Sequence, residues 1–215
     1  MKNTINSLEF FPNRYYTTSK NMDFTELESH IENTVSEKRM RHCKATASVA
    51  VGLAGRFKRY HITEEDARIV GLWHDIAREW GDEALYHFCV EHDITMEVEE
   101  QECPMLLHGA VASVLLRQRC ADVPQYYIDA IRWHTLGSTS MGPLGAMLFI
   151  ADYLEPYRTH IDDPNKVRIL SLSSLEQMCL DIISMTEDYF ARRKACPLAT
   201  STLNLKQYLK VGGTF

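Results

Sequence analysis

The sequence Gly71-Leu72-Trp73-His74-Asp75-Ile76-Ala77 decides the fold, because it sets an adjacent histidine and aspartate within an otherwise apolar segment. Neighbouring residues on a helix point about 100° apart around its axis, so near a helix end both side chains can reach one site. The carboxylate of Asp75 has two oxygens and can bridge two metal ions, whereas His74 can bind only one. The pair therefore predicts a metal site at the end of a helix.

Further histidines and an aspartate fall on apolar helical faces before and after this pair. Residues three, four and seven positions apart share a helix face, and His42, for example, shares its face with Ala45, Val49 and Leu53. A polar group buried there without a partner costs roughly 1–3 kcal/mol, which a shared metal ion would offset. A hydrogen-bonded core residue is the ordinary role of any single buried histidine, but it does not account for the whole set. The additional candidate ligands are His42, His108, His134 and Asp152.

This combination of ligands favours a particular chemistry. Imidazole nitrogens and carboxylate oxygens suit iron, manganese and similar transition ions. Two such ions about 4 Å apart can bind both oxygens of an in-line phosphoryl displacement, lower the pKa of a bridging water and neutralise charge on the phosphoryl oxygens. The hydroxide formed in this way is the natural nucleophile for phosphorus. We therefore expect a metal-dependent phosphohydrolase in which Asp75 has the central catalytic role.

Length, charge and composition limit the alternatives. A chain of 215 residues, 45% of them hydrophobic, fits one domain over residues 23–215 with an N-terminal extension over residues 1–22. A net charge of −6 argues against nucleic acid as a partner, because nucleic-acid binding normally requires a basic surface. We find no secretory signal and no apolar stretch approaching 18 residues, so we expect a cytoplasmic protein without a membrane partner.

Caps, prolines and apolar periodicity predict an all-α fold, a compact bundle in which the ligands converge from several helices. One helix begins near residue 26, another carries His42 and ends near Phe57, and a cap formed by Thr63 and Asp66 opens the helix that ends at the His-Asp pair. The remaining helices are expected at 82–92, from His108 onward, from Pro124 to His134, from Pro143 to Glu155, over 168–193 as one long helix, and briefly within the last fifteen residues, with a loop around Pro104. No run of alternating residues is long enough to indicate a strand.

Longer motifs surround the candidate ligands. They are Lys38-Arg39-x-x-His42, Gly71-Leu72-x-His74-Asp75-Ile76-Ala77, Leu107-His108-Gly109, His134-Thr135-x-Gly137-x-x-x-Met141 and Ile150-Ala151-Asp152-Tyr153-Leu154-Glu155-Pro156-x-Arg158. Over roughly residues 36–195 the chain resembles the HD-domain phosphohydrolase superfamily, which is named after its His-Asp pair. Within that superfamily, the motifs are similar to those of the bacterial symmetrical diadenosine tetraphosphate hydrolases.

The resemblance implies an all-α HD fold, two divalent metal ions and cleavage of diadenosine tetraphosphate into two ADP. The metal would commonly be iron, with manganese or another transition ion as alternatives, and the nucleotide would be the small-molecule partner. A homodimer is also implied. By position, one ion would be held by His42, His74, Asp75 and Asp152, and the other by Asp75, His108 and His134.

The resemblance also implies residues that contact the substrate. Arginines would supply positive charge to the phosphates and to the leaving ADP, and Glu155 would brace Arg158 through a charge-assisted hydrogen bond. Arg78 stands where the family usually has lysine, so it would contact phosphate with a planar guanidinium rather than a point charge. The candidates for substrate binding are Arg39, Arg78, Thr135, Gly137 and Arg158.

The sequence leaves two other functions open. One is another HD phosphohydrolase, acting on a nucleoside monophosphate or a cyclic dinucleotide. The second histidine pair, His108 and His134, favours two-ion enzymes over single-metal nucleotidases of this kind. The other is a metal-dependent nucleotide sensor without turnover, although such sensors usually lose ligands and this chain has the whole set.

Overall fold

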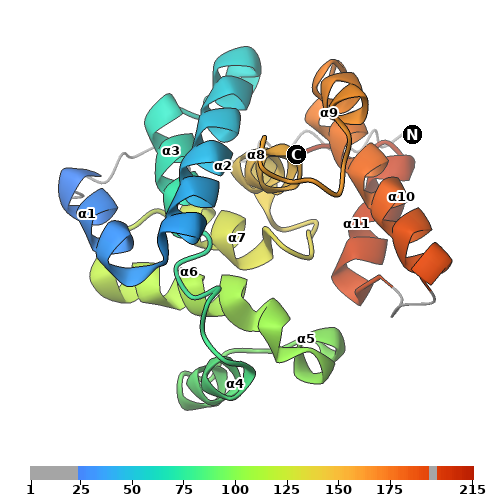
Figure 1. The fold of residues 1–215 in the computed structure, drawn as a ribbon. Coiled ribbons are helices and arrows are strands. Elements are labelled where there is room, and N and C mark those ends of the chain that lie inside the picture. Colours follow the sequence, from blue (N-terminus) through green and yellow to red (C-terminus); the bar gives the residue numbers. More distant parts are fainter. Residues whose placement is uncertain (1–23, 194–197) are drawn as a thin grey trace, which may run out of the picture.

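The regular elements are all helical, which confirms the all-α prediction. The computed structural model describes residues 24–193 and 198–215, and within them it contains no β-strand. The expected N-terminal extension, residues 1–22, lies outside the described residues. In chain order the elements are α1 (Phe24–Thr34), α2 (Glu37–Arg56), η1 (Lys58–Tyr60), α3 (Glu64–Trp73), α4 (Asp82–Glu91), α5 (Val98–Glu102), η2 (Pro104–Leu107), α6 (His108–Arg119), α7 (Gln125–Trp133), α8 (Gly142–Leu154), α9 (Asp163–Leu170), α10 (Leu175–Arg193) and α11 (Thr200–Lys210) (Figure 1).

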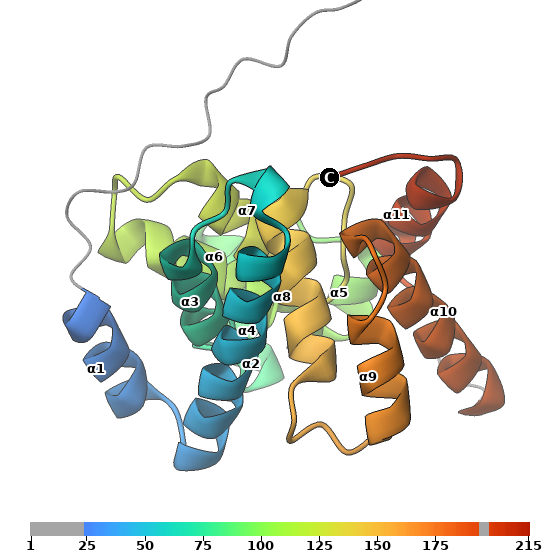
Figure 2. The same ribbon diagram turned by 90° about the horizontal axis from the view of Figure 1, so that it is seen from above.

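Helix α8 forms the centre of the bundle. Nine of its 13 residues are buried, and a helix that is apolar nearly all round requires neighbours on every side. It contacts α2, α3, α7 and α10, and Figures 1 and 2 show it between the α2–α3 pair and the α9–α10 pair. Neither α8 nor any other helix of the described residues is long and apolar enough to cross a membrane. Asp152 lies in the last turn of α8, and its side chain is 17% exposed.

Local capping determines where α2 and α3 begin. The hydroxyl of Ser36 caps α2 by accepting a hydrogen bond from the backbone N–H of Arg39 at 3.2 Å. Thr63 and Asp66 form the predicted capping box at the start of α3. Helix α3 ends at Trp73, so the His-Asp pair lies in the turn that follows and both side chains can face the interior.

A glycine allows α3 to approach α2 closely. A Cβ atom on Gly71 would lie 2.5 Å from the Cα of Ala47, closer than non-bonded carbon atoms approach one another. The missing side chain therefore lets the backbones pack together, and it brings the end of α3 next to the helix that carries His42. The close approach positions the His-Asp pair relative to α2.

Gly71→Ala should lower the free energy of unfolding by roughly 1–3 kcal/mol, because overpacking a filled interior costs about this much. Gly52→Ala is a matched control within α2, since a Cβ there would meet nothing within 4 Å. Alanine at position 52 should raise the free energy of unfolding by roughly 0.5–1 kcal/mol. Urea unfolding of both variants measures the difference, and stabilisation by both changes would contradict the close approach.

The segment 168–193 is not the single long helix that the periodicity predicts. Helices α9 and α10 are separated by the non-helical residues 171–174. The hydroxyl of Ser171 donates to the carbonyl oxygen of Arg168 at 2.7 Å, and Ser174 Oγ accepts a backbone N–H from the first turn of α10 at 3.2 Å. Serine side chains compete with helical backbone hydrogen bonds in this way, so they end one helix and begin the next.

The segment before His108 also has more helix than expected. The sequence predicts a loop around Pro104, whereas α5 and the 3₁₀ helix η2 occupy this segment. Pro104 is the first residue of η2, where its fixed φ and missing N–H are tolerated. The helical turn η2 leads directly into α6 and sets His108 at the junction of the two elements.

Candidate metal centre

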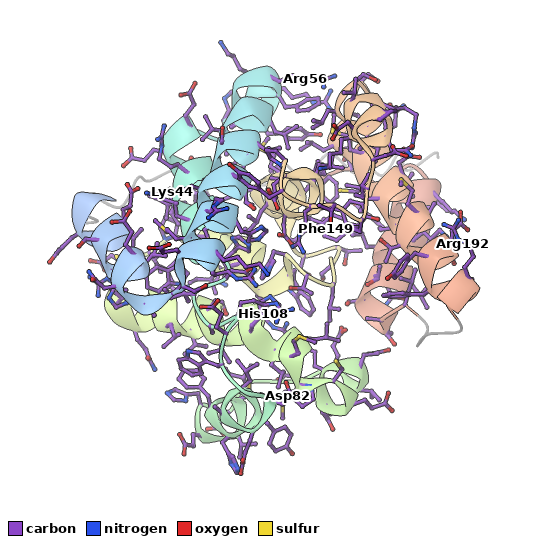
Figure 3. The ribbon with its side chains drawn as sticks, in the orientation of Figure 1. Lys44, Arg56, Asp82, His108, Phe149 and Arg192 are labelled. Carbon is purple, nitrogen blue, oxygen red and sulfur yellow. The ribbon has the colours of Figure 1, made fainter. Side chains whose placement is uncertain are left out.

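The structure brings all six predicted ligands together. His42 lies in α2, the His-Asp pair follows α3, His108 begins α6, and Asp152 lies in the last turn of α8. His134 directly follows α7. His108 lies near the middle of the view in Figure 3, whereas Asp82 lies below it, at the start of α4. The six side chains converge although they are spread over 111 positions of the chain, His42 to Asp152.

The first group of ligand atoms surrounds the Nε2 atom of His42. This nitrogen lies 3.0 Å from Asp152 Oδ1, 3.2 Å from His74 Nε2 and 3.3 Å from Asp75 Oδ2. His74 Nε2 is 3.7 Å from the same Asp152 oxygen. Ligand atoms this close to one another can share a single metal ion.

The second group surrounds the other oxygen of Asp75. Asp75 Oδ1 lies 3.2 Å from His108 Nε2 and 3.6 Å from His134 Nε2. The two Nε2 atoms are 3.1 Å apart. Asp75 therefore presents one carboxylate oxygen to each group, which is the arrangement that a bridging ligand requires.

The orientation of the imidazole rings tests whether the residues fit a metal. Three of the four rings place Nδ1 within 2.6–2.8 Å of a backbone carbonyl oxygen, so the proton lies on Nδ1 and Nε2 carries a lone pair. The Nε2 lone pairs of His108 and His134 lie 3.1 Å apart, and they repel unless a cation lies near both. The donor set fits divalent transition ions. The three rings and their acceptors are His74 with Gly71, His108 with Met105, and His134 with Ile131.

The electrostatics favour a cation at the same point. Burial raises the pKa of Asp75 and of Asp152, but nearby positive and hydrogen-bonding groups outweigh it and hold both pKa values well below their ordinary range. Burial lowers the pKa of His74 and of His108, which keeps these rings neutral. His42 is the exception: burial lowers its pKa, but Asp152 and Asp75 raise it to about 9. Two ionised carboxylates thus attract positive charge to the position that Nε2 of His42 faces.

Glu155 has a different partner from the one that the sequence suggested. It does not brace Arg158; its Oε1 lies 3.2 Å from Nδ1 of His42 instead. Arg158 contacts Asp152, because its Nη2 lies 2.5 Å from Oδ1 and its Nε–H donates to the backbone carbonyl oxygen at 3.0 Å. Glu155 is thus a contact of the candidate ligand His42 that sequence reasoning missed.

The arginines predicted to bind substrate lie at different places around the ligands. Arg39 Nη1 is 2.5 Å from Asp75 Oδ2, and Arg158 contacts Asp152 at the same distance. Their side chains are 22% and 35% exposed, whereas that of Asp75 is 3% exposed, so the guanidinium groups lie on the solvent side of the carboxylates. Arg78 is half-buried and forms no ion pair with any described residue.

The two other predicted substrate residues differ in what they present. Thr135 Oγ1 lies 3.0 Å from His134 Nε2 and 3.2 Å from His108 Nε2, so its hydroxyl is part of the second group. Gly137 has a φ of +74°, and a Cβ there would lie 2.9 Å from a methyl carbon of Leu205. Backbone geometry and packing account for a glycine at position 137, and its contact with substrate stays a prediction.

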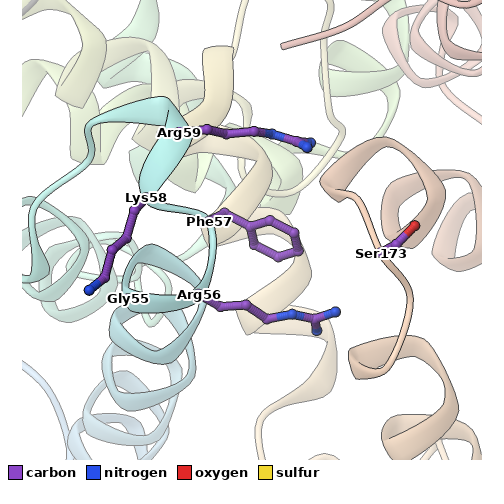
Figure 4. Close-up of a pocket in the computed structure, with 6 residues that line it drawn as sticks. All are labelled: Gly55, Arg56, Phe57, Lys58, Arg59 and Ser173. Atoms are coloured by element: carbon purple, nitrogen blue, oxygen red, sulfur yellow. The ribbon is translucent and has the colours of Figure 1, made fainter.

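A separate concavity lies at the end of α2 and is shown in Figure 4. Its volume is about 560 Å³, and none of the six candidate ligands lines it. Arg56 donates there to the backbone carbonyl oxygens of Leu170 and Leu172, so its charge is already used at the end of α9. The lining residues are Gly55, Arg56, Phe57, Lys58, Arg59 and Ser173.

Comparisons with known proteins identify the family of the chain. Residues 39–157 match the HD domain family. A symmetrical bis(5'-nucleosyl)-tetraphosphatase of Bacillus subtilis is 26% identical over 191 residues, which cover 89% of this chain and 100% of the relative. A Staphylococcus aureus protein of the same name is 24% identical, covering 64% of this chain and 69% of the relative. The crystal structure of a Clostridium acetobutylicum protein, described as a predicted HD superfamily hydrolase involved in NAD metabolism, superposes with a TM-score of 0.79 at 26% identity. The match covers 88% of this chain and 98% of that one. The chain therefore belongs to the HD domain family, as its His-Asp pair and all-helical fold indicate.

Proposed function

We propose that this HD-domain protein is a metal-dependent hydrolase that cleaves diadenosine tetraphosphate symmetrically into two ADP. The observation that carries the proposal is the position of Asp75, whose two oxygens face two separate groups of histidine nitrogens. Relatives named for this activity support the choice of substrate, and they match the chain over most of its length. The substrate would be a small nucleotide.

The candidate ligands divide between two ions. His42, His74, Asp75 and Asp152 would hold one, and Asp75, His108 and His134 the other. His74 lies near both positions, because its ligand atom also groups with those of Asp75 and His134. Iron is the metal that we expect, with manganese as the nearest alternative, because imidazole and carboxylate groups suit both. Bound at these positions, the ions would act as Lewis acids towards phosphoryl oxygens and would make water a nucleophile near neutral pH.

The chain's own residues bind and orient the polyphosphate. Arg158 uses Nε and Nη2 on Asp152, and its Nη1 forms no hydrogen bond with the described residues, so it can donate to a phosphate oxygen. Arg39 contacts Asp75 through Nη1 alone, and Thr135 has a hydroxyl that can donate beside His108 and His134. These groups offset the negative charge that the leaving ADP carries.

Arg158→Ala should raise KM for diadenosine tetraphosphate by about 10- to 100-fold, because a hydrogen bond to a charged group contributes roughly 1.5–3 kcal/mol. The value of kcat should fall less, since the ligands remain. Arg168→Ala is the matched control: this arginine pairs with Asp181 on the surface, and its loss should leave KM unchanged. Initial rates over a range of substrate concentrations measure both parameters. An unchanged KM with normal turnover in Arg158→Ala would remove this residue from the site.

A panel of substrates tests the proposed function against its alternatives. Metal-replete protein is incubated with diadenosine tetraphosphate, a nucleoside monophosphate and a cyclic dinucleotide, each with and without a chelator. The proposal expects the highest kcat/KM for diadenosine tetraphosphate and loss of activity with the chelator. Preferred cleavage of either other substrate would instead indicate another HD phosphohydrolase, and binding of nucleotides without any cleavage would indicate a sensor.

A further inference from the structure

His42 differs from the other three candidate histidines in the partner of its Nδ1 atom. The other rings donate to backbone carbonyl oxygens three residues earlier in their own turns. His42 Nδ1 instead lies 3.2 Å from Oε1 of Glu155, a carboxylate that is 2% exposed and 113 positions away in the chain. The direction in which His42 points therefore depends on a side chain from another part of the fold.

Glu155 belongs to a turn, residues 155–158, that contacts two candidate ligands. Its Oε2 accepts the backbone N–H of Tyr157 at 2.6 Å, and its carbonyl oxygen accepts the backbone N–H of Arg158 at 3.1 Å. Arg158 reaches back to Asp152 at the end of α8. The same turn thus meets His42 through Glu155 and Asp152 through Arg158, and these two ligands face one another at 3.0 Å.

Lys166 of α9 supports this turn from a different element. Its side chain is buried, with 7% exposure, and Nζ donates to the carbonyl oxygens of Glu155 and Pro156, both at 3.2 Å. No carboxylate among residues 24–193 and 198–215 forms an ion pair with it. A buried ammonium is costly unless it is compensated, and the turn carbonyls provide that compensation. Lys166 therefore fixes the turn at Glu155 and Pro156, which lie between Asp152 and Arg158.

We propose that Glu155 and Lys166 are positioning residues for the ion that would be held by His42, His74, Asp75 and Asp152. A carboxylate on the second nitrogen of a ligand imidazole fixes the ring and makes the ligand nitrogen more basic. Lys166 acts one step further away, by holding the turn that presents Glu155. The inference rests on the proposed function, because it requires that ion. The ion held by His108 and His134 should be independent of both residues, since those rings use their own turns.

Manganese binding to the metal-stripped full-length chain, followed by isothermal titration calorimetry, tests this division. In Glu155→Gln, one of the two affinities should fall by about 10- to 100-fold while the other stays unchanged. Lys166→Met keeps the length of the side chain and removes its charge, and it should weaken the same affinity by about tenfold. Because Lys166 acts through Glu155, the double variant should bind no more weakly than Glu155→Gln alone.

Lys206→Met is the matched control for a purely structural effect. Lys206 of α11 is also largely buried, with 12% side-chain exposure, and it pairs with Glu187 of α10 away from the candidate ligands. Its loss should lower the melting temperature and leave both affinities unchanged. If Glu155→Gln leaves both affinities unchanged, or weakens both equally, the inference is wrong while the proposed function stands. This test does not depend on whether Lys166→Met folds. A wild-type chain that binds no manganese, iron or other divalent ion overturns the proposed function and the inference with it.

Discussion

Replacing Asp75 by alanine is expected to reduce kcat/KM for diadenosine tetraphosphate by at least about 10³-fold, the upper range for loss of one stabilising group in an enzyme site. Asp75 is the residue that faces both groups of ligand atoms, because Oδ2 lies 3.3 Å from His42 and Oδ1 lies 3.2 Å from His108. Its loss removes a ligand from each ion. Steady-state kinetics, together with metal content by mass spectrometry, should record a fall in activity and in both ions.

Two further variants distinguish the loss of the bridging carboxylate from a general effect of substitution. Asp75→Asn preserves the shape of the side chain and removes its charge, so it should be impaired to a similar degree. Asp82→Ala removes an exposed carboxylate at the start of α4 and should leave kcat/KM unchanged. An Asp75→Ala protein that keeps activity within about tenfold of wild type would contradict the bridging role.

Replacing His134 by alanine is expected to remove one of the two ions and to reduce kcat by at least about 10²-fold, while the chain stays folded. His134 Nε2 faces His108 and Asp75. Of the candidate ligands around the Nε2 atom of His42, the ring of His134 contacts only His74 and Asp75 among the described residues. The ion held by His42 and Asp152 should therefore remain. Metal content per chain tests the loss of one ion, and circular dichroism tests whether the chain stays folded.

His87→Ala is the control for a general effect of histidine loss. His87 is exposed on α4 and lies near Glu83 of the same helix, away from the candidate ligands. Its replacement should change neither metal content nor turnover. If His134→Ala retains the same metal content as wild type, the assignment of His134 as a ligand is wrong.

The sequence predicts the fold class and the meeting of the six ligands, because both follow from local rules. The capping box of Thr63 and Asp66 begins α3 where expected, and Pro143 lies in the first turn of α8. A buried polar residue on an apolar face has few partners, so a set of such residues indicates a common site. The structure brings these candidates within 3–4 Å of one another, whereas their role as metal ligands stays a proposal.

Features that depend on packing between distant elements could not be predicted in this way. Glu155 lies three positions from both Asp152 and Arg158, and the spacing gives no sign that it contacts His42 on α2 instead. Lys166 stands among polar residues of a short helix, and only the path of the chain between α8 and α9 buries it. The break at 171–174 arises because serine hydroxyls outweigh an apolar periodicity that continues through it. The expected homodimer depends on surfaces between two chains and likewise stays a prediction.

The products formed from diadenosine tetraphosphate decide whether the chain is a symmetrical hydrolase. Metal-replete protein and a chelated control are compared by anion-exchange chromatography, which separates AMP, ADP and ATP. We expect ADP as the sole product, formed only with metal, because symmetrical cleavage breaks the bond between the two inner phosphates. AMP together with ATP, or ADP formed equally well in the chelated control, would contradict it.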